Sequence, residues 1–360
     1  VTCSSSAACD DIDNYLNIPS PMTGDMEINL DDIDAIECDP LGDPRDTEEI
    51  IVEGGTLTLK SSSNMRFVNV GFTVLSGAGL VFDMPETQLG PNEPGFRDQD
   101  GYAMEVEEGA SVTFTGNVVA MELTNVGSVF RNDGSVEIKG TAYFEANSNV
   151  FRLNTGTVKF RDDATFKENN FLAIDNRDSG FVRFSGAAVF EDNGSNFDGA
   201  YGCSVTNLDS TGRVIFRGDA SFSNDDCFEG VSLYNGGTMK FYGKAYFNDN
   251  ESNENGGAVL NNGGSLTFRG ATQFNNNYSA DFGGALAVQG GDVTFNKAAR
   301  FTGNTADESG AAFAFGTLFY PHPPLSTLVQ GDGDCTVGEV VDGATVVGFP
   351  GDDVCVAATA

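Results

Sequence analysis

Apolar and polar residues alternate in short runs through most of this chain. The stretch "GSLTFRGATQF" at 264–274 holds two such runs, and in each the apolar side chains lie two residues apart. Side chains two apart project from the same face of a β-strand. A glycine separates the two runs, an asparagine-rich bend follows them, and a third short apolar run completes the period. The pattern therefore predicts short β-strands.

The same period recurs along the chain. Its first run is anchored at Phe114, Ile138, Phe160, Phe184, Phe216, Phe241, Phe268 and Phe295. The spacing between anchors is irregular, which fits loop insertions in a solenoid better than a coiled-coil repeat. Three short strands per period, each stacked on its copy one period later, predict an all-β fold. We expect a right-handed parallel β-helix of roughly ten coils, with a rise of about 4.8 Å per coil.

Stacking in such a helix places like side chains over one another. The anchors would form one inward column, and a second phenylalanine column would contain Phe144, Phe166, Phe190, Phe222, Phe247, Phe274 and Phe301. A third column would contain the asparagines of the F-x-x-N motif, namely Asn147, Asn169, Asn193, Asn250, Asn277 and Asn304. Because asparagine tolerates left-handed backbone and bonds to turn amides, we expect these residues to form the bend.

The repeat divides the chain into three parts. Residues 1–49 carry no repeat, hold three cysteines and are rich in acids, so we expect an N-terminal cap on the solenoid. Residues 50–318 would form the parallel β-helix, with a protruding loop at 85–102. Residues 319–360 begin with the proline cluster "YPHPP", which favours extended backbone, and would form a C-terminal β extension or cap.

Cysteine spacing fits the same picture. Cys203 and Cys227 are 24 residues apart, which is one coil, and the distance between adjacent strands suits a disulfide. We expect a second disulfide between Cys335 and Cys355, a third among Cys3, Cys9 and Cys38, and one remaining thiol; the alternative is that all seven are buried free thiols. Disulfides, together with an N-terminus typical of a processed chain, favour an extracellular or cell-surface location.

The F-x-x-N motif is followed by G-G-A in the later repeats. It is found as "FNDNESNENGGAVL" (247–260), "FNNNYSADFGGALAV" (274–288) and, in a weaker form, "FTGNTADESGAAFAF" (301–315). This combination resembles the repeat of the polymorphic outer membrane proteins, which are surface adhesins of chlamydiae. The resemblance implies a β-helical surface protein of the adhesin type. The N-terminal repeats depart from it, because they keep F-x-x-N without G-G-A.

Charge narrows the possible partners. The chain has 53 acids and 19 bases, for a net charge of −34. Phosphate repels such a surface, so nucleic acid is excluded as a partner, and no apolar run is long enough to predict a membrane span.

The bases are distributed unevenly. Residues 1–44 and 301–360 hold no Lys or Arg, whereas several bases fall on outward positions of the first strand. This basic stripe contains Lys139, Lys159, Arg161, Arg183, Arg217, Lys240 and Arg269. Acidic ends and a basic flank are complementary between copies, which predicts self-assembly. The alternative is that the stripe pairs with acids on adjacent strands.

Candidate sites for chemistry are few. The single histidine is His322, and the pair Asp352 and Asp353 lies outside the repeats without a basic companion, so we predict no catalytic residues. Asp98, Asp100 and Glu107 have the offsets of a calcium loop, but Phe96 occupies the first ligand position. Asp332 and Asp334 form a second acidic turn. We expect no cofactor beyond weak Ca²⁺ binding.

Three F-x-x-N asparagines, Asn193, Asn250 and Asn277, also begin N-glycosylation sequons. An inward column would exclude glycans from them, and an outward one would admit them; we favour the inward orientation.

Three functions follow from these features. The first is a non-enzymatic extracellular structural protein that assembles into a filament or surface layer, with another copy of itself as partner. The second is a monomeric adhesin or carbohydrate-binding rod that contacts a glycan or cell-surface receptor. The third is a polysaccharide lyase or hydrolase.

Overall fold

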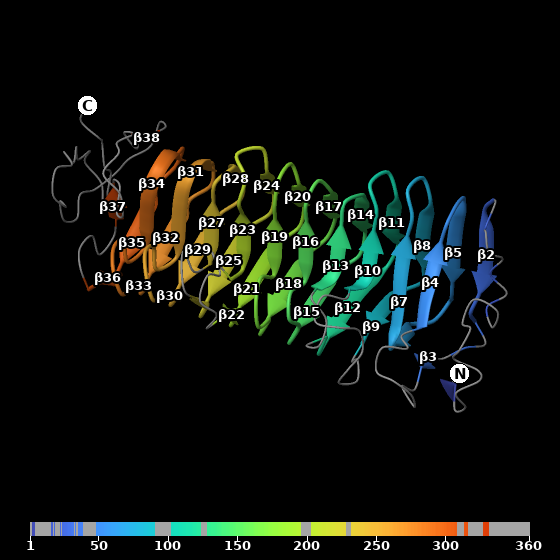
Figure 1. Ribbon diagram of the computed structural model, residues 1–360. Coiled ribbons are helices and arrows are strands. Elements are labelled where there is room, and N and C mark those ends of the chain that lie inside the picture. Colours follow the sequence, from blue (N-terminus) through green and yellow to red (C-terminus); the bar gives the residue numbers. More distant parts are fainter. Residues whose placement is uncertain are drawn as a thin grey trace. The chain divides into compact units, whose positions relative to one another are not determined.

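The computed structural model describes residues 2–3, 16, 18, 22, 24–31, 33, 35–38, 48–90, 102–123, 128–195, 203–227, 232–307, 313–315 and 327–330 (Figure 1). Every regular element in this part of the chain is a β-strand, and no helix in it could cross a membrane. The strands stack as a parallel β-solenoid of about nine turns, consistent with the predicted right-handed parallel β-helix. The chain divides into two compact units, Val1–Asn170 (unit 1) and Phe171–Ala360 (unit 2).

Unit 1 contains three columns of parallel strands, and each full coil adds one strand to each column. The V-x-F column contains β2 (Met26–Asn29), β5 (Thr56–Lys60), β8 (Gly79–Asp83), β11 (Ser111–Phe114), β14 (Ser135–Ile138) and β17 (Thr157–Phe160). The A-x-F column contains β1 (Thr2–Cys3), β3 (Ala35–Cys38), β6 (Met65–Val68), β9 (Glu86–Leu89), β12 (Asn117–Met121), β15 (Ala142–Glu145) and β18 (Ala164–Lys167). The third column contains β4 (Glu48–Val52), β7 (Val70–Val74), β10 (Tyr102–Val106), β13 (Ser128–Asn132) and β16 (Phe151–Leu153).

Unit 2 repeats this plan. Its V-x-F column contains β20 (Phe181–Phe184), β24 (Arg213–Phe216), β28 (Thr238–Phe241), the second halves of β31 (Val259–Phe268) and β34 (Leu286–Phe295), and β38 (Thr327–Gln330). Its A-x-F column contains β21 (Ala188–Glu191), β25 (Ala220–Ser223), β29 (Ala245–Asn248), β32 (Thr272–Asn275) and β35 (Ala299–Thr302). Its third column contains β19 (Ile174–Asn176), β23 (Val205–Asn207), β27 (Leu233–Asn235), the first halves of β31 and β34, and β37 (Phe313–Phe315).

A fourth, short column follows the bend in unit 2. It contains β22 (Gly194–Ser195), β26 (Asp226–Cys227), β30 (Glu251–Ser252), β33 (Tyr278–Ser279) and β36 (Thr305–Ala306). Its strands also pair in parallel from one coil to the next. The sequence pattern alone did not separate this segment from the bend.

Stacked phenylalanine rings fill the interior of unit 2, as the repeat predicts. The V-x-F column stacks Phe184, Phe216, Phe241, Phe268 and Phe295, with successive ring centroids 4.5–4.9 Å apart. The A-x-F column stacks Phe190, Phe222, Phe247, Phe274 and Phe301 at 4.7–4.9 Å. Rings of the two columns meet edge to face, a favoured aromatic geometry.

Unit 1 has the same interior with a less uniform composition. Phe144 stacks on Phe166 at 5.0 Å, and Phe114 stacks on Phe82, which precedes the first predicted anchor, at 4.7 Å. A further stack, which was not predicted, joins Phe130 and Phe151 in the third column at 4.4 Å.

The bend after each A-x-F strand differs from its prediction. The left-handed backbone falls on the residue before each ladder asparagine, at Ala146, Glu168, Asp192, Asp249, Asn276 and Gly303, and on Asn224, which precedes Asp225. None of the F-x-x-N asparagines has a positive φ. The expectation that asparagine itself adopts the left-handed conformation is therefore wrong, and its role in the bend is hydrogen bonding.

The stacking extends past the predicted ends of the solenoid. In the predicted cap, β2 pairs with β5 and β3 pairs with β6. In the predicted C-terminal extension, β38 pairs with β34. The segment 85–102, predicted to protrude, begins with β9, which pairs with β6 and β12.

Candidate interaction surface

The F-x-x-N asparagines form a buried, hydrogen-bonded ladder along each unit. In unit 2 the backbone N–H and the side-chain Nδ2 of Asn250 both donate to Oδ1 of Asn277, at 3.2 and 2.9 Å. The same Nδ2 donates to the carbonyl oxygen of Phe222 at 3.3 Å. Asn277 bonds to Asn304 in the same way. In unit 1 Asn147 repeats the arrangement with Asn169.

A second amide ladder runs along the third column of unit 2. Nδ2 of Asn176, Asn207 and Asn235 donates to Oδ1 of the asparagine one coil further, at 2.7, 2.9 and 2.8 Å. The last acceptor is Asn261. This ladder was not predicted, although the signal was present in the sequence, because an asparagine ends the third run in each of these repeats.

The three sequon asparagines lie inside the first ladder. Asn193 and Asn277 are 0% exposed, and Asn250 is 1% exposed. Their side-chain nitrogens already donate within the ladder, that of Asn193 to Asp225 as well as to Ser204. The inward orientation that we favoured is therefore the one the structure has.

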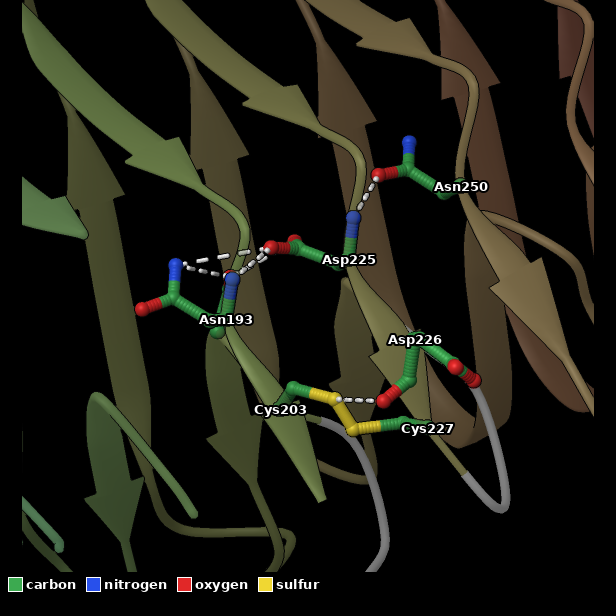
Figure 2. The surroundings of a disulfide bond; sticks show 7 residues. Asn193, Cys203, Asp225, Asp226, Cys227 and Asn250 are labelled. Atoms are coloured by element: carbon green, nitrogen blue, oxygen red, sulfur yellow. Dashed lines mark hydrogen bonds between the residues drawn. A yellow bond between two sulfur atoms is a disulfide. The ribbon is translucent and has the colours of Figure 1, made fainter. Parts of the chain in front are cut away.

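One rung of the ladder is an acid. Asp225 lies between Asn193 and Asn250, and it comes from "FSND", where no ladder residue was predicted (Figure 2). The disulfide between Cys203 and Cys227 lies nearby, with Cα atoms 5.9 Å apart and both residues buried. This pairing is the one that the one-coil spacing predicts. Cys9, Cys335 and Cys355 lie outside the described residues, whereas Cys3 and Cys38 are register partners in the parallel strands β1 and β3.

The basic stripe is divided between the two units, and in unit 1 one of its residues forms an ion pair with an acid. Lys139, Lys159 and Arg161 belong to unit 1, where Nε of Arg161 donates to Oε1 of Glu137 at 2.6 Å. Glu137 also lies directly opposite Lys159 in the strand register.

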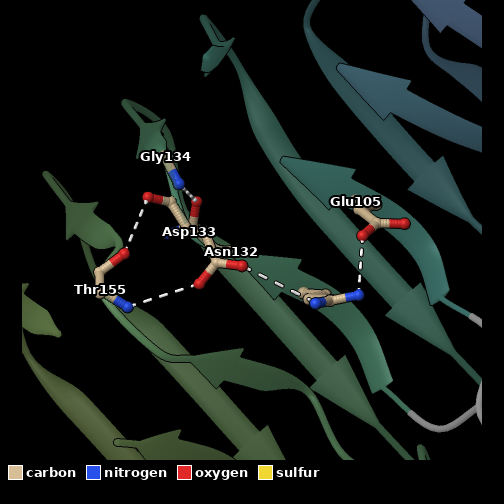
Figure 3. A network of polar contacts seen from close by, with 6 residues as sticks. Glu105, Asn132, Asp133, Gly134 and Thr155 are labelled. Carbon is tan, nitrogen blue, oxygen red and sulfur yellow. Dashed lines mark hydrogen bonds and ion pairs between the residues drawn. The ribbon is translucent and has the colours of Figure 1, made fainter. Parts of the chain in front are cut away.

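Another cation of unit 1 is bound in the same manner. Arg131 donates to Glu105 at 2.9 Å and lies 3.8 Å from Asp133, which in turn accepts from the Thr155 amide (Figure 3). For Arg131 and Arg161, pairing with an acid on an adjacent strand is what the structure shows.

In unit 2 the basic residues of the V-x-F sheet face have no such partners among the described residues, although Arg177 of the same unit pairs with Asp175. Arg183, Arg217, Lys240 and Arg269 belong to this unit, and Arg213, which the predicted stripe did not include, projects from the same sheet face. None of the five forms an ion pair with any described residue. Nε of Arg183 is buried without a hydrogen-bond partner in the described part of the chain. We call these five residues, with Phe181 and Tyr242, the basic face.

Strand register fixes the layout of the basic face. Arg213 lies opposite Phe181 on one side and Thr238 on the other, and Lys240 lies between Ile215 and Thr267. The outward positions of β20, β24, β28 and the second half of β31 hold no carboxylate. A chain with a net charge of −34 thus has a local positive surface on this sheet.

Aromatic rings hold three of the arginines in place. The guanidinium groups of Arg217 and Arg269 lie over the Tyr242 ring, 5.2 and 4.8 Å from its centroid. Arg213 lies 5.8 Å from the Phe181 centroid. A cation is attracted to the face of an aromatic ring at these distances and keeps its hydrogen-bond donors free. The basic face therefore presents ordered, unpaired donors for planar anions such as carboxylates.

Most of the residues considered for calcium binding or catalysis fall outside the described part of the chain. Asp98, Asp100, Asp332, Asp334, His322, Asp352 and Asp353 lie outside the described residues. Glu107 is exposed, and its Oε2 accepts from the Ser76 amide at 3.0 Å. In the described part of the chain, no group of three or more His, Cys, Asp or Glu could hold a metal ion.

An open hollow of about 400 Å³ in unit 1 is lined by Asp31, Lys60, Asp83 and Thr115, among others. Its carboxylates serve local turns. Oδ1 of Asp31 accepts from the Ser62 amide at 2.6 Å, and this hydrogen bond lowers the pKa of Asp31. Thr115 donates to Asp83 at 3.0 Å. A proton donor in a glycoside hydrolase needs a raised pKa, and the pKa of Asp31 is shifted in the opposite direction.

Comparison with known proteins gives no relative: no family model, no curated protein and no solved structure matches this chain. The resemblance to the polymorphic outer membrane proteins therefore has no support beyond the motifs themselves, whereas the solenoid fold stands on the strand pairing.

Proposed function

We propose that this protein is a non-enzymatic extracellular structural subunit that self-associates through its basic face. The occupant of that face is an acidic, base-free terminal segment of a second copy. One observation carries the proposal: five cations without ion pairs to any described residue share one sheet face in a chain with 53 acids and 19 bases.

The terminal segments have the complementary charge. Residues 301–360 contain no Lys or Arg, and they include Asp332, Asp334, Asp352 and Asp353. Residues 1–44 are likewise free of bases. Carboxylates accept bidentate hydrogen bonds from arginine, which adds geometric fit to the attraction between charges. Salt screens attraction between exposed charges, so this association should weaken as ionic strength rises.

Three features support the extracellular and structural parts of the proposal. The Cys203–Cys227 disulfide is typical of proteins that mature in an oxidising compartment. The F-x-x-N and G-G-A motifs resemble those of a surface-protein family, which favours a surface location. The ladders of Phe and Asn give each unit a regular interior suited to a rigid building block.

The test is the association state of the full chain. Sedimentation velocity at low and physiological salt, with electron microscopy of the same samples, should show salt-sensitive oligomers or filaments. A variant with Arg217, Lys240 and Arg269 changed to Gln should remain monomeric. The matched control changes Lys139, Lys159 and Arg161 to Gln; it alters the net charge equally but leaves the basic face intact, so it should still associate. A wild-type monomer under all conditions, calcium included, would contradict the proposal.

An acidic polysaccharide is the second candidate occupant, and one observation favours it. Along each of two rows of the basic face, a cation occurs in every second coil. In one row Arg217 and Arg269 lie one coil before and one coil after Tyr242, which places the two arginines about 10 Å apart at the usual strand spacing. Same-side residues of an extended peptide repeat every ~7 Å, so a polysaccharide charged on alternate sugars fits this spacing better. Binding of heparin by a monomeric wild type, lost in the Arg217, Lys240 and Arg269 variant, would favour this function over self-assembly.

A further inference from the structure

Asp225 occupies a position that is an amide in the other F-x-x-N repeats. Its backbone N–H donates to Oδ1 of Asn250 at 3.1 Å, as the ladder requires. Its own Oδ1 accepts from the backbone N–H of Asn193 at 3.0 Å. The carboxyl group is fully buried, and the residue is 1% exposed. A buried acid has thus replaced a buried amide without a change in the course of the backbone.

Asp225's own coil and the coil before it carry a matching change. The residue just before each third-column strand of unit 2 is Ala173, Ser204, Ser232, Ala258 or Ala285 in chain order. Among these five positions, serine occurs only in Asp225's own coil and in the coil before it. Oγ of Ser204 donates to Oδ2 of Asp225 at 2.6 Å, and the Ser232 hydroxyl approaches it without forming a hydrogen bond of standard geometry. The acid and the serines therefore form one buried polar group.

An ionised carboxylate fits this rung less well than an amide. In the rungs that follow Asp225 along the ladder, the asparagine Nδ2 donates to a phenylalanine carbonyl of the preceding coil, as that of Asn250 does to Phe222. It also donates to Oδ1 of the following rung, as Asn250 does to Asn277. A carboxylate only accepts hydrogen bonds, whereas a protonated carboxyl group has one O–H donor. Only the neutral acid reproduces a donor of the amide.

We propose that Asp225 is a pH-sensitive latch in unit 2, which holds its coil in the ladder while the carboxyl group is protonated and loosens that coil when the group ionises. The groups facing it are Asn193 and Ser204 from the preceding coil, Ser232 from its own coil and Asn250 from the following coil. None is charged. The neighbouring Asp226 is exposed, and the Cys203–Cys227 disulfide carries no charge. No cation among these groups thus offsets the cost of a buried carboxylate.

Burial has the expected effect on the acid. It raises the pKa of Asp225 from 3.8 to about 7, against the opposing hydrogen bonds from Ser204 and Asn193. Because the pKa is higher in the folded protein than in the unfolded chain, folding takes up a proton between these two values. The stabilisation by the neutral acid is complete below pH 3.8 and is lost as the pH rises to about 7. The disulfide would keep the adjacent coils tethered after the latch opens.

The decisive comparison is between the wild type and Asp225→Asn, which restores the residue found in the neighbouring rungs. Urea unfolding of the oxidised full chain, measured from pH 4 to pH 8.5, gives the difference in the free energy of unfolding between the two proteins. Repulsion among the other acids is common to both proteins and cancels in this difference. The unfolding equilibrium constant of the wild type relative to Asp225→Asn should rise by up to tenfold per pH unit between about 4 and about 7. Asp226→Asn, the exposed neighbour, should follow the wild type.

Carbon-13 NMR of labelled aspartate reads the same group directly. One carboxyl resonance of the wild type should titrate near neutral pH and be missing from Asp225→Asn. Parallel unfolding curves for the two proteins, or a wild type whose aspartates all titrate below pH about 5, would overturn the proposal. A difference in the free energy of unfolding that is the same at every pH would also overturn the proposal, because it would show that Asp225 affects stability through packing and not through ionisation. None of these outcomes depends on self-association through the basic face.

Discussion

Nδ2 of Asn277 donates to Oδ1 of Asn304 at 2.8 Å, and these two residues stand 27 positions apart at equivalent points of adjacent coils. The same nitrogen donates to the Phe247 carbonyl at 3.1 Å. One buried amide thus connects three coils, so the ladder joins the repeats through their polar groups as the phenylalanine columns join them through their rings.

Loss of one amide should therefore destabilise unit 2. Changing Asn277 to Ala removes the donors to Asn304 and Phe247 and leaves the Asn250 amide without its acceptor. Buried polar groups without partners cost about 1–3 kcal/mol each, so we expect a loss of about 2–4 kcal/mol. Urea unfolding measures it. Asn275→Ser on the outer face of the same repeat should cost less than about 1 kcal/mol, and an equal loss in both variants would deny the ladder a special role.

The phenylalanine columns should dominate the stability of each unit. Phe216 is fully buried and stacks on Phe184 at 4.8 Å and on Phe241 at 4.5 Å. Phe216→Ala should cost about 3–5 kcal/mol, because it removes a large buried side chain and leaves a cavity. The control is Leu208→Ala, whose side chain is 39% exposed; its change should stay within about 0.5 kcal/mol. Thermal unfolding of both variants provides the check, and a tolerant Phe216 site would refute the assignment of that column to the core.

Much of this arrangement could be predicted from the sequence, for a physical reason. Stacked coils force equivalent positions to repeat, so Phe241 and Phe268 are recognisable as copies from their flanking residues alone. Exceptions to the repeat were harder to predict. Asp225 breaks the F-x-x-N motif, and only its neighbours in space, Ser204 and Ser232, show how an acid is accommodated there. Likewise, strand register decides that Arg161 of unit 1 meets an acid while the basic face of unit 2 does not, and single motifs do not contain that register.

The sequons offer a test of the buried ladder by modification. Asn193, Asn250 and Asn277 are at most 1% exposed, so folded protein secreted from a eukaryotic host should carry no glycan on them. Intact mass before and after enzymatic deglycosylation would show this. Asp209→Asn creates a new sequon with Ser210 and Thr211 at an exposed turn of the same unit, and that variant should gain a glycan. Glycans on the native sequons of well-folded protein would be incompatible with the inward ladder.

The Cys203–Cys227 disulfide should stabilise unit 2 mainly by restricting the unfolded chain. It closes a loop with a sequence separation of 24 residues, for which the expected contribution is about 2–4 kcal/mol. Changing both cysteines to Ser should lower the free energy of unfolding by that amount under oxidising conditions. Addition of a reductant should then affect the wild type more than the variant, since the remaining cysteines are common to both. Equal sensitivity to reductant would show that the stabilising disulfide lies elsewhere in the chain.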